Sequence, residues 1–272
     1  MKKLVSTVLT LGKVMLKSKG VGKSKGKLRG DVLIVMGNGP SLRQTLSESR
    51  HSLMNHDTMA VNFAANTPEF FELRPAHYIL ADPHFFRKDN PDPNVGKLWE
   101  ALSRVDWPMT LHLPAGSRKM APALPDNVSL EFFNMTPGEG YDVVCHRLFR
   151  SGLAMPRPRN VLIPALMEGI RSGYSEIYIV GADHTWPHTL NVDNLNRVVS
   201  VQPHFYEDNS KELDRVAREY AGLHIHDVLG SMVVAFRSYH EIKRFADKTG
   251  VAIFNSTPVS LIDAFTRRCL PD

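Results

Sequence analysis

The feature that most constrains the fold is an apolar run that ends in a glycine-rich turn, VLIVMGNGPSL at residues 32–42. Uninterrupted apolar residues over 32–36 predict a strand that is buried on both faces. Glycine lets the backbone turn sharply after such a strand, and proline suits the first turn of a following helix. A strand, a glycine turn and a helix N-terminus in this order predict a phosphate site. The nucleotide-binding candidates here are Gly37, Asn38, Gly39, Pro40 and Ser41.

The same turn disfavours two familiar nucleotide sites. It lacks the third glycine of a dinucleotide fingerprint, and no Walker lysine follows it, which argues against an NAD site and against a P-loop. The chain also contains no Asp-x-Asp sequence, the usual metal motif of sugar-nucleotide enzymes. The alternative is a tight strand-to-helix turn that binds no ligand.

Apolar strand-like runs alternate with helical stretches from residue 31 onward. This alternation predicts an α/β fold with a mostly parallel sheet. At 272 residues and 43% apolar content, the chain is long enough to bury one sizeable core. The predicted strands are 32–36, 58–61, 77–80, 110–112, 177–180 and 251–254. The predicted helices are 97–105, 160–173, 211–220 and 231–249.

Polar residues follow several of the predicted strands at the point where each strand ends. Asn62 follows the second strand, Asp82 the third, and Asp183 the strand at 177–180. Ligands of open parallel sheets bind beyond the carboxyl ends of the strands. We therefore expect these residues to line one crevice together with Asn38.

Residues 184–210 show no helical or strand period. A long loop of this kind in a compact domain is usually functional, so we predict a lid over the crevice. Its candidate catalytic residues are His204, His184, Asp208 and Tyr206. Histidine titrates near neutral pH, which favours His204 as a general base, with His184 as the second choice. The pairs His184–His188 and His224–His226 leave a zinc site as an alternative, although we expect no metal.

The first 30 residues are strongly basic. They carry nine lysine and arginine residues and no acidic one, whereas the whole chain has a formal net charge of +5, so the remainder is at about −4. The remainder thus has no basic footprint for nucleic acid. Leu4, Val8, Leu11 and Met15 recur at helical spacing, in a run too short to span a bilayer. We expect residues 1–28 to contact an anionic membrane surface, with a flexible linker at 17–29; the alternative is a leader that is solvated or docks on its own domain.

These motifs, in this order, resemble the family 42 bacterial sialyltransferases. They also resemble the related flagellin-modifying, unknown-function and pterin-pyrophosphokinase-like proteins. The resemblance rests on GNGPSL at 37–42, Asn62, Asp82-Pro83, GYSEIYIVGAD at 173–183, HFY at 204–206 and FNSTPVSLIDAF at 254–265. It covers most of residues 31–265 and is weak from 86 to 158.

The resemblance implies one Rossmann-like, GT-A-like α/β domain over residues 31–272, with about seven mostly parallel strands and a lid at about 184–210. It implies a glycosyltransferase that moves an acidic sugar from a CMP-sugar to a glycan or lipid-linked acceptor, in surface polysaccharide synthesis. Transfer would be an inverting, metal-independent displacement. Asn38, Asn62 and Asp82 would hold the nucleotide, Asn160 would add contacts from the start of its helix, and a lid base would deprotonate the acceptor hydroxyl.

The chain departs from the sialyltransferase pattern after the Gly-x-Asp turn. Two tyrosines that stabilise the departing phosphate in that family correspond here to Thr185 and Asn191, and the lid histidine corresponds to Asp208 or, with a shorter lid, to His204. His184, Tyr206 or the N–H groups of the loop would then neutralise the phosphate. These departures point away from sialic acid itself and are compatible with another CMP-sugar.

Three other functions stay open. A pterin-type pyrophosphokinase would need carboxylates for Mg²⁺, for which Asp82 and Asp183 are the candidates. A noncatalytic nucleotide-binding module and, more distantly, a methyltransferase are the others. Two cysteines, Cys145 and Cys269, are too few for a disulfide framework, so we expect a cytoplasmic protein at the inner face of the membrane. The sequence leaves open whether it forms a homo-oligomer.

Overall fold

Eight strands form one sheet in which every hydrogen-bonded neighbour is parallel. The computed structural model describes residues 1–200 and 220–272. The strands of the sheet are β1 (Val32–Met36), β2 (Asp57–Val61), β3 (His77–Ile79), β4 (Met109–Pro114), β5 (Val128–Phe133), β6 (Glu176–Val180), β9 (Ala252–Asn255) and β10 (Thr266–Arg267). The predicted α/β fold with a mostly parallel sheet is confirmed, with eight strands in place of about seven.

All six predicted strands belong to this sheet, whereas β5 and β10 were missed. The sequence of β5, VSLEFF, mixes polar and apolar residues, and β5 is the last strand at one edge of the sheet. The two residues of β10 are too few to show a period. A short antiparallel ribbon, β7 (Asn191–Val192) with β8 (Val198–Val199), lies outside the sheet.

The strand order is β10-β9-β6-β1-β2-β3-β4-β5. The chain therefore leaves β1 in one direction through β2 to β5, and later returns to the other side of β1 with β6. The crevice between two such neighbours, outside their carboxyl ends, is where open α/β sheets bind ligands. The loops after β1 and β6 begin at Gly37 and Gly181, so both predicted motifs lie at this switch point.

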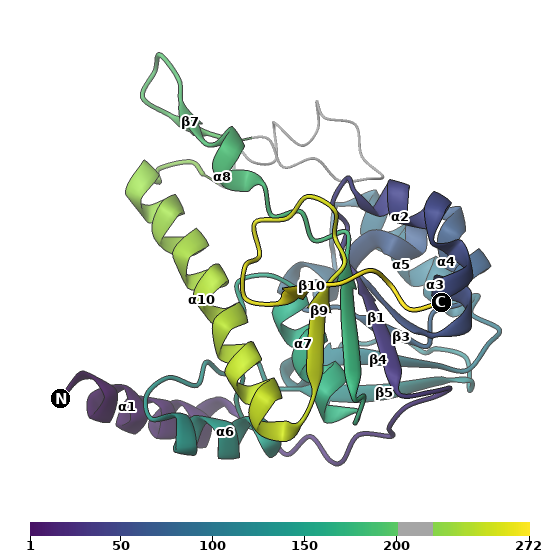
Figure 1. Ribbon diagram of the computed structural model, residues 1–272, viewed down its shortest axis with the longest axis horizontal. Helices are drawn as coiled ribbons and strands as arrows, with labels where there is room; N and C mark the ends of the chain where they lie inside the picture. Colours follow the sequence, from purple (N-terminus) through teal and green to yellow (C-terminus); the bar gives the residue numbers. More distant parts are fainter. Residues whose placement is uncertain (201–219) are drawn as a thin grey trace.

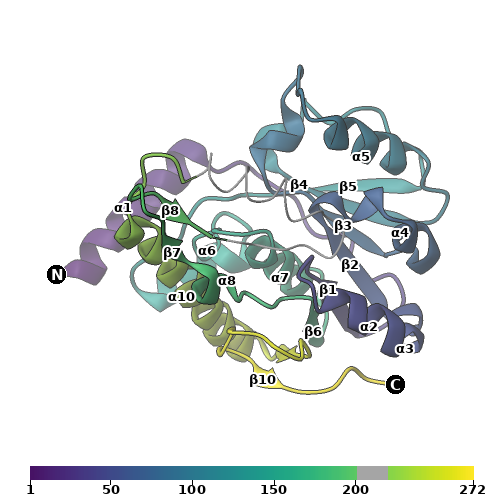
Figure 2. The ribbon, with the colours of Figure 1, turned by 90° about the horizontal axis from the view of Figure 1, so that it is seen from above.

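Helices cover both faces of the sheet (Figures 1 and 2). One layer holds α1 (Lys2–Lys17), α6 (Asp142–Arg150), α7 (Leu162–Arg171) and α10 (Ile225–Thr249). The other holds α2 (Leu42–Glu48), α3 (Arg50–Asn55), α4 (Pro68–Leu73) and α5 (Pro93–Ser103). The other short helices of the described residues are η1 (Asn62–Asn66), η2 (Pro83–Phe86), η3 (Ala115–Ser117) and α8 (Trp186–Thr189).

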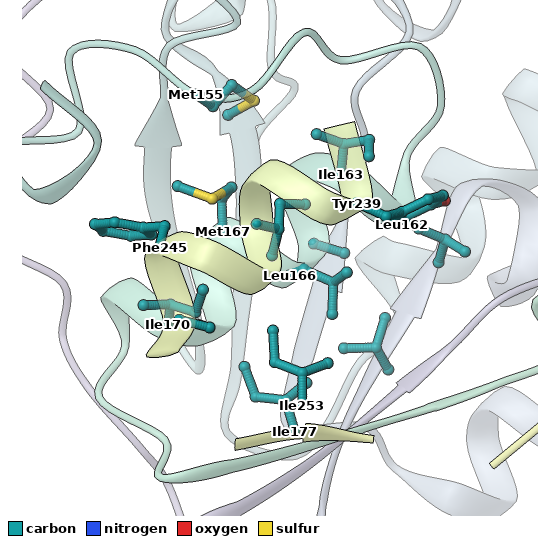
Figure 3. Close-up of a cluster of buried hydrophobic side chains, with 14 of the residues drawn as sticks. Met155, Leu162, Ile163, Leu166, Met167, Ile170, Ile177, Tyr239, Phe245 and Ile253 are labelled. Atoms are coloured by element: carbon teal, nitrogen blue, oxygen red, sulfur yellow. The ribbon is translucent and has the colours of Figure 1, made fainter. Parts of the chain in front are cut away.

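Helix α7 lies between the sheet and α10, and its residues from Leu162 to Ile170 are all buried. Figure 3 shows side chains of α7 meeting Tyr239 and Phe245 of α10 on one side and Ile177 and Ile253 of the sheet on the other. The inward stripe predicted for residues 231–249 is confirmed, and α10 ends at Gly250, which has a φ of 77°. The helix predicted at 211–220 lies, apart from Tyr220, outside the described residues.

The N-terminal strap, residues 18–29, runs along the amino ends of the strands (Figure 1). Buried side chains accept its N–H groups: Glu131 from Lys25 at 2.5 Å, and Asp57 from Leu28 at 3.0 Å and from Arg29 at 2.9 Å. The prediction of a flexible linker at 17–29 is therefore wrong, because this backbone has fixed partners in the sheet.

Candidate functional site

The loops that follow β1 and β6 are hydrogen-bonded backbone to backbone at the switch point. The N–H of Gly37 donates to the carbonyl of Val180 and the N–H of Gly39 to that of Gly181, both at 2.8 Å. A Cβ atom on Gly37 would lie 2.5 Å from the Gly181 oxygen, and one on Gly181, whose φ is 61°, would lie 2.5 Å from the Gly37 oxygen. The glycines are therefore required by this loop-to-loop contact.

Asp183 lies at the start of α2. Its carboxylate accepts from the Ser41 hydroxyl at 2.8 Å and from the Ser41 N–H at 3.3 Å. A Cβ atom on Gly39 would lie 2.0 Å from this carboxylate, so the second glycine gives Asp183 its space. Burial raises the pKa of Asp183, and the hydrogen bonds from Ser41 act in the opposite direction.

This contact changes the interpretation of the glycine turn. The sequence predicted that the N–H groups of Gly37–Ser41 face a phosphate, whereas in the structure two of them bond to the β6 loop and a third to Asp183. Pro40 is exposed in the turn just before α2. A phosphate at the Ser41 N–H would have to displace the Asp183 carboxylate.

Asn38 and Asn62 connect β1, β2 and β3 at their carboxyl ends. The buried Asn38 amide donates to the Val61 carbonyl at 3.2 Å, at the end of β2. Asn62 follows with a φ of 52°, a left-handed conformation that asparagine tolerates. Its carbonyl accepts from the hydroxyl of Tyr78 in β3. Both residues lie at the predicted edge.

Asp82 lies two strands away from β1, after β3. It is exposed, and its carboxylate caps η2 by accepting from the His84 N–H at 2.7 Å. Asp82 thus lies at the same edge as Asn38 and Asn62, as expected, but its bond is to its own turn. Ligand contact by Asp82 stays a prediction.

A buried polar chain joins β6, α7 and α10. The His184 Nε2 atom lies 2.6 Å from the Tyr239 hydroxyl, which donates to the Asn160 Oδ1 atom at 3.0 Å. The same Asn160 oxygen accepts from the N–H of Leu162 at the start of α7. The Asn160 Nδ2 atom also lies 3.4 Å from the His184 Nε2 atom, so all three side chains are in mutual contact.

The surroundings of His184 disfavour its predicted role in acid–base catalysis. Burial lowers the pKa of His184 to about 3, so the imidazole is neutral and weakly basic. The ring lies against that of Trp186, with centroids 4.1 Å apart and an interplanar angle of 32°, and the backbone φ of His184 is 52°. Burial likewise raises the pKa of Tyr239. The hydrogen-bonded side chains of His184, Tyr239 and Asn160 are therefore suited to a positioning role.

The described part of the predicted lid consists of α8 and the β7–β8 ribbon. Trp186 and Leu190 pack with Val198 against Val228 and Met232 of α10. This described part of the predicted lid therefore packs on the N-terminal half of α10. The candidates His204, Tyr206 and Asp208 lie outside the described residues, and their roles stay predictions.

Sequence reasoning missed two groups that position the site. Tyr239 was predicted as part of an apolar stripe, and no local signal distinguishes its hydroxyl. The segment after β9 holds the loop of Asp183, because the Thr257 hydroxyl accepts from the Ala182 N–H at 3.1 Å and the Ser260 hydroxyl donates to the Ala182 carbonyl at 2.6 Å. The motif at 254–265 could have indicated this segment.

Among the described residues, the side chains with metal-ligating geometry are His112, Glu131 and Glu168. They lie beneath the sheet on the α7 side, away from the crevice. Arg171 forms ion pairs with both carboxylates, so its guanidinium supplies the positive charge that balances them. His224 and His226, a zinc alternative, are exposed at the start of α10, where His224 and Asp227 form a capping box.

No protein-family model and no curated protein matches the chain. Among solved structures, the MAf glycosyltransferase from Magnetospirillum magneticum AMB-1 resembles it, with a TM-score of 0.50 over 97% of this chain and 10% sequence identity. The chain spans 37% of the length of that protein. The likeness shows a shared α/β fold with a mostly parallel sheet between two helical layers.

Proposed function

We propose that the chain is a glycosyltransferase that binds a nucleotide sugar in the crevice between the carboxyl ends of β1 and β6. The observation that carries the proposal is the switch point itself, where Asn38, Asp183 and their glycine loops meet. The shared fold with the MAf glycosyltransferase supports it. A CMP-linked acidic sugar is the proposed donor, and a glycan or lipid-linked molecule the proposed acceptor.

In the proposed reaction, an acceptor hydroxyl oxygen attacks the anomeric carbon of the donor sugar. The bond from that carbon to the donor phosphate breaks, and its electron pair leaves with the nucleotide. The hydroxyl proton passes to a base, for which His204 is the first candidate and Asp208 the second. Tyr206 would donate a hydrogen bond to the departing phosphate, and no step needs a metal.

The contacts at the crevice suggest how the described residues would act. Asn38, Asn62 and Asp82 lie at the ends of three successive strands, within the region that a nucleotide would cover. The carboxyl of Asp183 is held by Ser41, so it would shape the floor of the crevice. The chain of His184, Tyr239 and Asn160 would fix the wall beside it.

The test is a thermal-shift screen of the full chain with CMP, CDP, UDP and ATP, each with and without Mg²⁺. Stabilisation by CMP or CDP without metal is the expected result, because ligands that bind only the folded state raise its apparent stability. Stabilisation by ATP with Mg²⁺ alone would overturn the proposal and favour the pyrophosphokinase.

The second measurement separates chemistry from binding. Replacing His204 by Ala should abolish transfer of the sugar while CMP still raises the melting temperature as in the wild type. The matched control is His188→Ala, an exposed histidine of the same lid, which should keep both properties. Transfer by the His204 variant at the wild-type rate would show that another group is the base.

A further inference from the structure

Helix α1 is attached to the domain by a polar edge. Its buried residues are Thr7, Thr10 and Val14. The Thr10 hydroxyl donates to the Glu139 carbonyl at 2.8 Å and accepts from the Glu139 N–H at 2.9 Å, and the Thr7 hydroxyl accepts from the Tyr141 N–H at 2.9 Å. These three bonds determine which side of the helix faces the domain.

The apolar side chains of α1 consequently point into solvent. Seven of them are between 42% and 86% exposed: Leu4, Val5, Val8, Leu9, Leu11, Met15 and Leu16. At 3.6 residues per turn they share one sector of about 160°. A helix of a water-soluble domain normally turns its apolar sector inward, and apolar side chains grouped in this way mark an interaction surface.

The charge around this sector indicates the chemistry of its partner. Lys2, Lys13 and Lys17 follow one another along one border of the sector, and α1 contains no acidic residue. The strap adds further lysines, also without an acidic one. An apolar sector bordered by lysines matches acyl chains beneath anionic headgroups. A second copy of the chain would instead bring like charges together.

We propose that α1 lies flat in an anionic membrane surface, with its apolar sector among the acyl chains and its lysines at the headgroup phosphates. No helix of the described chain is long and apolar enough to cross a bilayer, which fits a helix lying in the plane. The alternative, a leader that docks on its own domain, accounts for the contacts of Thr7 and Thr10 but not for the exposed apolar sector.

The structure also separates membrane contact from the crevice. Figure 1 shows α1 at the level of the amino ends of the strands, whereas the loops after β1 and β6 lie at the opposite edge of the sheet. The strap holds α1 to that amino edge through Asp57, Glu131 and Asn134. The two surfaces can therefore be altered independently, and the membrane proposal does not rest on the proposed reaction.

The test is flotation of the full chain with phosphatidylcholine vesicles, with and without phosphatidylglycerol. The wild type should float with the anionic vesicles, less so at high salt, and much less with phosphatidylcholine alone. The double variant V8D/M15D, which alters only exposed positions, should reduce binding about tenfold or more. The matched control is Leu195→Asp, equally exposed at the ribbon, which should bind like the wild type.

Three results would overturn the proposal. The first is a wild-type protein that does not float with the anionic vesicles. The second is a V8D/M15D variant that floats with them as well as the wild type does. The third is a dimer by light scattering that becomes a monomer in V8D/M15D without vesicles, since the partner would then be a second copy. CMP stabilisation of V8D/M15D, measured without vesicles, tests the proposed function separately.

Discussion

The two edges of the sheet carry different kinds of polar structure. On the α7 side of the sheet, a buried network contains most of the buried titratable side chains that the described residues place in one cluster: Asp57, His77, His112, Glu131, Glu168, Arg171 and Tyr174. The carboxyl edge has glycine turns, strand-end asparagines and two residues other than glycine, Asn62 and His184, with a φ of 52°. A count of titratable residues alone would favour the amino edge, whereas we propose the nucleotide site at the carboxyl edge.

The network at the amino edge stabilises the fold, because its members form hydrogen bonds and ion pairs with one another. The Tyr174 hydroxyl donates to Asp57 at 2.6 Å, so the Nε2 atom of His77, 2.7 Å away, donates to Tyr174. His77 then accepts from His112 at 3.0 Å through its Nδ1 atom. Burial and, to a smaller extent, His112 lower the pKa of His77, which keeps it neutral.

Arg171 completes this network. Burial alone would raise the pKa of Glu168, but contacts with His112 and Arg171 lower it, so the carboxyl is ionised. Arg171 also reaches Glu131 at 3.2 Å and the Gly22 carbonyl of the strap at 3.3 Å. The comparison teaches that buried charge here stabilises the fold and the strap, whereas backbone geometry marks the candidate site.

The largest expected effect is at the amino edge. Arg171→Met leaves two buried carboxylates without their cation, which should lower the free energy of unfolding by about 3–5 kcal/mol in urea denaturation. CMP affinity of the folded fraction should not change. The control is Arg244→Met, since Arg244 is half-exposed with partners at 3.7 Å and 3.8 Å and should cost less than about 1 kcal/mol. Equal losses of unfolding free energy in both variants would contradict a stabilising role of this network.

A somewhat smaller effect is expected at the carboxyl edge. Gly181→Ala places a Cβ atom against the Gly37 carbonyl at a positive φ, which should cost about 2–4 kcal/mol in urea denaturation. Unlike the arginine variant, it should also abolish stabilisation by CMP at temperatures where the protein remains folded. Gly116→Ala is the control, because its Cβ atom meets open space. Unchanged CMP binding in Gly181→Ala would place the nucleotide elsewhere.

The third expected effect is a dependence of stability on pH. The pKa of His184 is about 3 in the folded chain and near 6.5 when unfolded, so the unfolded state binds the proton first as pH falls. The contribution of neutral His184 is complete above about pH 6.5 and is lost toward pH 3, by up to about 1.4 kcal/mol per pH unit.

Chemical denaturation between pH 7 and pH 4 measures this loss. His184→Gln should make the dependence shallower, and His77→Gln should do the same at the amino edge, because burial lowers both pKa values. His188→Gln, at an exposed position, should leave the slope as it is. A wild-type slope in the His184 variant would mean that the ring is not held neutral.

Local pattern predicted the sheet well, and it placed four strand-end residues at one edge of the sheet. The strands β1, β2 and β6 and the inward face of α10 could be predicted because buried elements carry apolar residues in a regular pattern. In the strands the pattern is a continuous run, and in α10 it is a helical stripe. The strand β5 was missed because its sequence mixes polar and apolar residues. The strap was missed because polar side chains of the sheet hold its backbone. Asn38, Asn62, Asp82 and Asp183 were found because strand ends of a parallel sheet share one edge.

The sequence by itself determined that the chain has a parallel α/β sheet, a glycine turn after its first strand and a basic amphipathic leader. Only the tertiary structure decided which groups those features face. Asp183 bonds to Ser41 across 142 positions of the chain, and Glu131 to Lys25 across 106. A local period records which face of an element is buried, but the partner of a polar group depends on strand order, and strand order is set by the packing of the whole sheet.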